Sequence, residues 1–317
     1  MKIDKLRRWQ IVLIGQSNEA GAGEMPMGNG GYGRPLLDPS LPNGTNIASS
    51  MWPWLAERLG RYGVQLSVHN TGYGSTGAAE HWCGRCRTWA ANMLVGRGSY
   101  VLASGGLWKA NPPWTFPTST VAPTGTANMT TADGIPWIYV GVPAGTDTDG
   151  TLYAPGSARF DPNGFMAAVG TGLSAASNGG FDRRIAVVSI GQTDKTFSIP
   201  RATYAQALQN LSTHALTLGA SHVLLGFTCT GNTAGLTAWY DSDLVPGMTD
   251  AQTALAGNAA VIPGVNLYAR LGALATGPAS PHTAGLKTDN LHLNNTALRL
   301  AADAYMEKLL SVPKLWN

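Results

Sequence analysis

The sequence has few charged side chains. Asp, Glu, Lys and Arg make up 12% of its 317 residues, about half of the ~25% that is usual in soluble proteins. A chain kept disordered by its charge is excluded, because 44% of the residues are hydrophobic and can fill a large core. The formal net charge is +3, and basic residues adjoin only at Arg7-Arg8 and Arg183-Arg184. The sequence therefore indicates no nucleic-acid partner.

Long apolar runs and cysteine frameworks are also missing. No apolar stretch approaches the ~20 residues that span a bilayer, and no signal-type segment precedes the strand-like run that begins at Trp9. The sequence thus predicts neither a membrane span nor a cleavable signal, and it leaves the compartment open, extracellular or virion-associated places included. Three cysteines are too few for a disulfide framework.

Strand-like and helix-like segments alternate along the chain. Four apolar, β-branched runs predict buried strands, and apolar residues at three-to-four spacing predict helices. The strands are expected at Trp9–Ile14, Val64–His69, Arg184–Ile190 and His222–Phe227, and the helices at 50–62, 198–219 and 295–310. Continuous apolar strands separated by helices predict a three-layer α/β/α sandwich with a mostly parallel central sheet, formed as one domain over residues 1–317.

The middle of the chain, from about 93 to 165, lacks this periodicity and is rich in Gly, Pro, Thr and Trp. We expect an ordered insertion with short antiparallel strands such as Trp137–Val142, because so many aromatic residues disfavour disorder. Aromatic rings can stack on sugars, so Trp82, Trp108 and Trp114 are candidate substrate-binding residues. The alternative is that the tryptophans form a hydrophobic plug that stabilises the insertion.

The first strand leads directly into Gly15-Gln16-Ser17-Asn18. Ligands bind at the carboxyl ends of strands in an open parallel sheet, and a serine in a Gly-flanked turn there exposes its hydroxyl group. Ser17 is therefore a candidate nucleophile. An ordinary strand-to-helix turn with a capping serine is the simpler alternative.

Near the other end of the chain, Asp289 and His292 form a D-x-x-H motif just before the last predicted helix. A histidine can accept the serine proton, and a neighbouring carboxylate holds the tautomer of that histidine. A single D-x-x-H motif usually reflects surface polarity or helix capping. Its pairing with the GQSN turn is harder to attribute to chance.

With these motifs, the sequence resembles the SGNH (GDSL-like) hydrolase superfamily, in particular the branch of carbohydrate O-acetylesterases and sialate O-acetylesterase-like proteins that has a GQSN nucleophile block. The resemblance covers about 9–92 and 184–310. It implies a flavodoxin-like scaffold with Ser17 as nucleophile, His292 as base and Asp289 as the acid that orients it. It implies no cofactor and no metal ion.

The resemblance also implies an oxyanion hole that begins with the backbone N–H of Ser17. The second block of the family corresponds to the segment around Gly74-Ser75-Thr76, where the family commonly has Gly-Gly-Thr, and Gly74 is the preferred donor. The third block, Gly191-Gln192-Thr193-Asp194, has a threonine where the family has an asparagine. Gln192 or Thr193 would therefore complete the hole. We expect Asp194 to hold the loop together.

Cys83 and Cys86 form a C-x-x-C pair, which in another context indicates redox chemistry or half of a zinc site. Here no thioredoxin-like arrangement surrounds the pair, so a local disulfide or two structural thiols is the better interpretation.

The sequence as a whole predicts a serine esterase that removes acyl groups, most often O-acetyl groups, from a carbohydrate. One alternative is a glycan-binding or attachment protein without turnover on the same scaffold, for example a phage virion component. The departures in the second and third blocks are what keep this alternative open.

Overall fold

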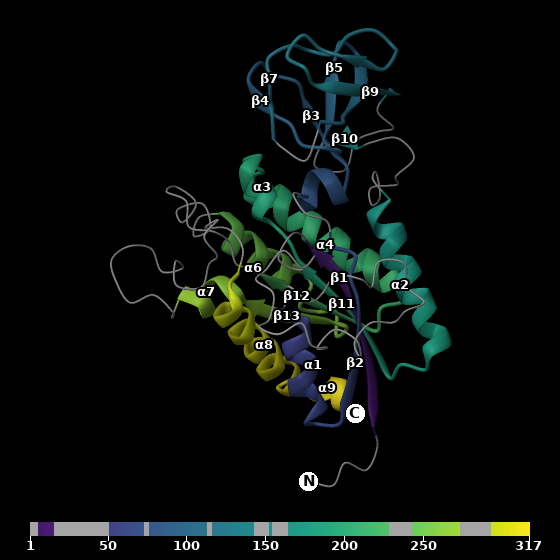
Figure 1. The fold of residues 1–317 in the computed structure, drawn as a ribbon, viewed down its shortest axis with the longest axis vertical. Coiled ribbons are helices and arrows are strands. Elements are labelled where there is room, and N and C mark those ends of the chain that lie inside the picture. Colours follow the sequence, from purple (N-terminus) through teal and green to yellow (C-terminus); the bar gives the residue numbers. More distant parts are fainter. Residues whose placement is uncertain are drawn as a thin grey trace.

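The computed structural model describes residues 6–15, 51–72, 76–112, 116–142, 152–153, 164–227, 243–272 and 293–317. Within them the chain forms a five-stranded parallel sheet covered by helices and a separate six-stranded sheet (Figure 1). The predicted α/β class with a parallel central sheet is confirmed. No helix in these ranges is both long and apolar enough to cross a membrane.

The central sheet fixes where the ends of the strands meet. Its strands are β1 (Arg7–Gly15), β2 (Val64–His69), β11 (Arg183–Ser189), β12 (His222–Phe227) and β13 (Val261–Asn266), in the spatial order β13-β12-β11-β1-β2. All neighbouring pairs are parallel. Counted along the chain, this is the flavodoxin-like order 2-1-3-4-5. After β1 the chain forms β2 on one side of β1, and it later returns to form β11 on the other side. The topological switch point therefore lies between β1 and β11.

Alternate side chains of β1 enter two separate cores. Trp9, Ile11 and Leu13 are buried against one helical layer, and Val12 and Ile14 are buried against the other. The first layer contains α1 (Trp52–Gly60), α7 (Leu267–Gly272), α8 (Asn295–Leu310) and α9 (Pro313–Trp316), and the second contains α2 (Phe165–Gly179), α4 (Arg201–Thr217) and α6 (Val245–Ala254). Because both faces are buried, the strand reads as one continuous apolar run.

The predicted bounds of one helix are confirmed, and the predicted start of another is wrong by a few residues. Helix α8 spans the predicted residues, and its apolar face is buried. Helix α4 begins at Arg201, not near Ser198, because Pro200 takes the N-cap position and Ser198 has a φ of 52°. Gly219, with a φ of 105°, follows the last turn of α4 as predicted.

The sequence pattern did not predict β13, the last strand of the central sheet. It contains Pro263 and Gly264, which are unfavourable in a buried strand. The proline is tolerated because β13 is an edge strand. At Gly264 a Cβ atom would lie 2.4 Å from the Cα atom of Gly226 in β12, so the close approach of the two strands requires glycine.

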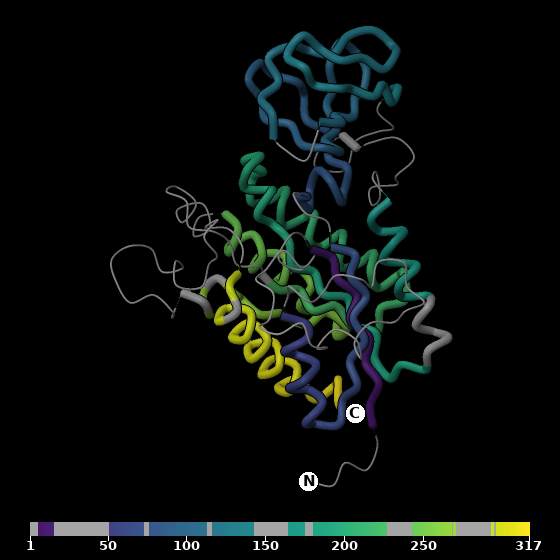
Figure 2. Tube along the Cα trace, in the orientation of Figure 1, coloured from purple at the N-terminus to yellow at the C-terminus, as the bar shows by residue number. Residues whose placement is uncertain are grey.

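The middle segment folds as the small sheet, in the spatial order β10-β3-β5-β6-β9-β8. Its strands are β3 (Arg85–Thr88), β5 (Tyr100–Ala103), β6 (Gly106–Ala110), β8 (Met129–Thr130), β9 (Pro136–Gly141) and β10 (Leu152–Tyr153), and a second pair joins β4 (Met93–Leu94) to β7 (Thr118–Ser119). The strand predicted at 137–142 is β9. The small sheet begins at Arg85, upstream of the start expected near residue 93, and it lies at the end of the molecule toward which β1 runs (Figure 2).

Candidate active site

The carboxyl ends of β1 and β11 lie side by side. In the parallel register Gly15 is opposite Ser189, so the GQSN and GQTD segments continue from the ends of neighbouring strands. Open α/β sheets bind ligands at such a switch point. The strand order and the two motifs therefore indicate the same crevice. Ser17 itself lies outside the described residues.

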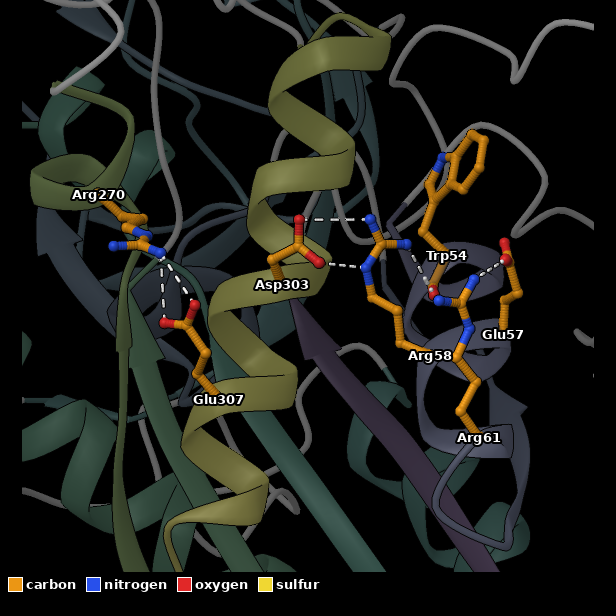
Figure 3. Close-up of polar contacts among 7 residues, drawn as sticks. All are labelled: Trp54, Glu57, Arg58, Arg61, Arg270, Asp303 and Glu307. Carbon is orange, nitrogen blue, oxygen red and sulfur yellow. Dashed lines mark hydrogen bonds and ion pairs between the residues drawn. The ribbon is translucent and has the colours of Figure 1, made fainter.

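The start of α8 lies at the same edge of the sheet. Helix α1 ends just before β2, where the backbone N–H of Arg7 at the start of β1 donates to the carbonyl of Gly63, so α1 runs toward the amino edge of the sheet. Helix α8 runs beside α1 in the same direction, since Arg58 of α1 pairs with Asp303 (Figure 3) and Arg299 lies 4.3 Å from the ring centre of Trp54, one turn earlier on each helix. Both helices thus run from the carboxyl side of the sheet toward its amino edge.

Leu293 and Asn294 lead into α8 at this edge. Leu293 is buried in the core, and the Asn294 side chain accepts a hydrogen bond of 3.0 Å from the backbone N–H of Ala297 as an N-cap. His292 directly precedes Leu293 in sequence. His292 and Asp289 lie outside the described residues.

A buried tyrosine shapes the turn of the third block. Gly191 has a φ of 155°, and a Cβ atom there would lie 2.7 Å from both the Tyr204 hydroxyl and the Leu244 side chain. The Tyr204 hydroxyl donates a 2.6 Å hydrogen bond to the carbonyl of Ile190. Nothing in the sequence singled out Tyr204, because it lies on the inner face of α4 like any core aromatic residue.

Gln192 and Thr193 begin the short helix α3 (Gln192–Thr196) and differ in burial. Thr193 is 4% exposed, and Gln192 is half-buried. The amide nitrogen of Gln192 is nevertheless buried, as the Thr193 side chain is.

The second block begins at the end of β2. The Thr71 hydroxyl donates to the carbonyl of Leu13 in β1, and the backbone N–H of Gly72 donates to the Asn70 side chain at 2.9 Å. These bonds fasten the start of the block to the central sheet. Gly74 lies outside the described residues. The next described residues begin at Thr76 and form the π-helical turn η2 (Ala78–Trp82).

Asp194 connects the third block to the second. Its fully buried carboxylate accepts hydrogen bonds from the backbone N–H groups of Ala78 (2.7 Å) and Ala79 (3.0 Å). Burial raises the pKa of Asp194 to about 6 against the opposing effect of these bonds. A Cβ atom at Gly77 would lie 3.1 Å from the same carboxylate, so the carboxylate packs closely against this backbone. The expectation that Asp194 holds the loop together is confirmed.

His81 is a structural residue in this arrangement. It is fully buried, and its Nδ1 atom accepts a 3.0 Å hydrogen bond from the backbone N–H of Gly77. Burial and the nearby Arg87 and Lys109 lower the pKa of His81 to about 3. The ring is therefore neutral at physiological pH and does not act as an acid–base group there.

Two of the candidate sugar-binding tryptophans are core residues. Trp82 and Trp108 are both 0% exposed, so neither ring offers a face to a sugar. Trp82 donates to the Thr76 hydroxyl at 3.1 Å, and Trp108 donates to the carbonyl of Ala103 at 3.2 Å. The plug interpretation is correct for Trp108, whose ring fills the core of the small sheet, whereas Trp82 belongs to the core between the central sheet and the layer of α2, α4 and α6. Trp114 lies outside the described residues.

Cys83 and Cys86 are both buried free thiols. Burial raises the pKa of both, that of Cys86 to about 12. Redox exchange and metal binding need a thiolate, and burial disfavours that form at both positions. Across the described ranges, no three His, Cys, Asp or Glu residues are grouped so that they could hold a metal ion.

No protein-family model and no curated protein matches this chain. Among solved structures, it is similar to a family two carbohydrate esterase from Clostridium thermocellum in complex with cellohexaose, with 12% identity, a TM-score of 0.46 and coverage of 99% of this chain and 67% of the other. An inhibitor-bound aryl esterase from M. smegmatis has 12% identity, a TM-score of 0.44 and coverage of 96% and 99%. Est24, a carbohydrate acetylesterase from Sinorhizobium meliloti, has 11% identity, a TM-score of 0.41 and coverage of 95% and 98%. The fold class itself follows from the strand order and register.

Proposed function

We propose that this protein is a serine esterase of the SGNH type that removes acyl groups, chiefly O-acetyl groups, from a carbohydrate. Ser17 attacks the ester carbonyl, and His292 takes the serine proton and later gives it to the sugar oxygen. Asp289 orients His292 and stabilises the imidazolium form. Water then attacks the acyl-serine with His292 again as base, which releases acetate and restores Ser17.

One observation carries the proposal. The switch point between β1 and β11 brings the ends of the two strands together, and the segments containing Ser17 and Gln192 continue from those ends. The start of α8, which His292 nearly adjoins in sequence, lies at the same edge. This arrangement of the described flanking segments supports a single site at the carboxyl edge of the sheet.

The oxyanion hole is proposed to use the backbone N–H groups of Ser17 and Gly74 together with Gln192. Reach favours Gln192 over Thr193, because its side-chain amide places an N–H donor farther from the backbone than a threonine hydroxyl does. Gln192→Ala should lower kcat by about 10²–10³ with KM little changed, the usual effect of removing one such donor. Thr193→Val should leave kcat within about threefold. A large loss in Thr193→Val alone would reverse the assignment.

Acetate release from a panel of acetylated polysaccharides tests the function and the substrate class together. The wild-type protein should release acetate from at least one member, and Ser17→Ala should lower that rate by about 10³ or more while folding normally. Binding of a polysaccharide with no acetate release by the wild-type protein would instead support a glycan-attachment role.

A further inference from the structure

A buried ion pair joins the small sheet to η2. The carboxylate of Glu80 in η2 is 0% exposed and pairs with the guanidinium of Arg87 in β3. The Ser99 hydroxyl also donates to Glu80 at 3.2 Å, and Arg87 donates to the carbonyl of Leu94 at 2.6 Å. Arg87, Ser99 and Leu94 all lie in the segment that forms the small sheet and the β4–β7 pair. The Glu80 carboxylate therefore connects η2 to that segment.

An aromatic cluster joins the small sheet to the third block. The Phe197 ring, which follows α3, lies between His81 (5.6 Å between ring centres) and Phe116 (5.4 Å). The guanidinium of Arg87 lies 4.6 Å from the centre of the same ring. At Gly96 a Cβ atom would lie 3.1 Å from both phenylalanine rings, so the rings pack closely against this backbone.

Arg87 therefore contacts both segments that the oxyanion hole is proposed to use. It pairs with Glu80 beside the second block and covers Phe197 beside the third, and Asp194 ties these two blocks to each other. A buried ion pair adds little net stability compared with apolar side chains of the same volume. Its two fixed partners do restrict how the connected segments can lie.

We propose that Arg87 is a positioning residue, through which the small sheet holds the second and third blocks in the mutual arrangement that the oxyanion hole requires. This inference rests on the proposed esterase function. Through Arg87, the small sheet would contribute to kcat without touching the substrate.

The test replaces both members of the pair, Arg87→Met with Glu80→Met, in the full chain. Removing both charges leaves no unpaired charge in the interior, so the variant should fold. The control is Arg58→Met with Asp303→Leu, a partly buried ion pair between α1 and α8 on the opposite side of the central sheet (Figure 3). If the first variant does not fold, Arg87→Lys keeps the charge but loses the planar group that pairs and stacks.

Two measurements are made on each variant, ester hydrolysis and amide hydrogen exchange. We expect kcat to fall about tenfold to hundredfold with KM within twofold, because small displacements of catalytic groups have effects of this size. Exchange should become faster in residues 77–82 and 192–197, and the control should change neither quantity.

A folded variant with wild-type kcat and wild-type exchange would overturn the inference, as would an equal kcat loss in the control. If the wild-type protein hydrolyses no ester, the proposed function fails by itself. Exchange then still reports on Arg87, because it does not depend on catalysis, and unchanged exchange would overturn the positioning role.

Discussion

Asp194→Asn tests whether the bond between the second and third blocks has the electrostatics that its burial dictates. The carboxylate accepts two backbone N–H bonds with no exposure to water. The asparagine amide can accept with its oxygen only, and its NH₂ group would face the second N–H. Leaving one buried N–H without an acceptor costs ~1–3 kcal/mol.

The pH dependence gives the sharper prediction. The pKa of Asp194 is raised from 3.8 to about 6 in the folded protein, so the folded state holds this proton more tightly than the unfolded state does. Stability from this group is therefore largest at low pH and is lost as the pH rises from about 4 to about 6. At ~1.4 kcal/mol for each pH unit between the two pKa values, the loss is about 3 kcal/mol.

Urea unfolding of the wild-type protein and of Asp194→Asn at pH 4 and pH 7 measures this difference. The stability of the wild-type protein relative to the variant should fall by about 3 kcal/mol from pH 4 to pH 7, because asparagine does not titrate. Asp250→Asn is the control: Arg201 lowers the pKa of the exposed Asp250 from 3.8, so this group titrates below the range tested and the difference from wild type should hardly change between pH 4 and pH 7. A deficit for Asp194→Asn that is equal at both pH values, or that grows with pH, would refute the reasoning.

Two further predictions concern packing and thiol reactivity. Gly172→Ala should destabilise the fold by about 1–3 kcal/mol in urea unfolding, because the added Cβ would lie 2.2 Å from the buried His69 ring. In the control Gly60→Ala, the added Cβ meets no atom within 4 Å, so that variant should be neutral or stabilising. Equal effects of the two substitutions would contradict the close packing at Gly172. Cys83 and Cys86 should resist iodoacetamide at pH 8 in the native protein and react in urea, since burial raises the pKa of both thiols; rapid native labelling of either, read by mass spectrometry, would show that the site opens.

The strands and helices of the scaffold were predictable because their apolar patterns are strong. The run at Trp9–Ile14 is buried on both faces, and α8 presents one clean apolar face, so periodicity alone places both. The pattern did not predict β13, because Pro263 and Gly264 are unfavourable in a buried strand. They are tolerated because β13 is an edge strand and because Gly264 lies directly against Gly226. Both causes are tertiary and leave no local signal.

Among the polar residues around the site, some roles could be predicted from the sequence and others could not. The role of Asp194 could be inferred from its place in the third block, but Tyr204 and Arg87 act on backbone and side chains that only the fold brings near. The prediction for Trp82 and Trp108 failed for a related reason, since an indole ring has the same sequence signature in a sugar cleft and in a core.

The most direct test of the account is covalent labelling with a fluorophosphonate, which reacts with serines that a neighbouring base activates. The wild-type protein should gain one label, mapped to the peptide that contains Ser17 by mass spectrometry, and His292→Ala should gain none under the same conditions. A folded wild-type protein that stays unlabelled, or that is labelled at another serine, would contradict the proposal that Ser17 is the nucleophile of an esterase.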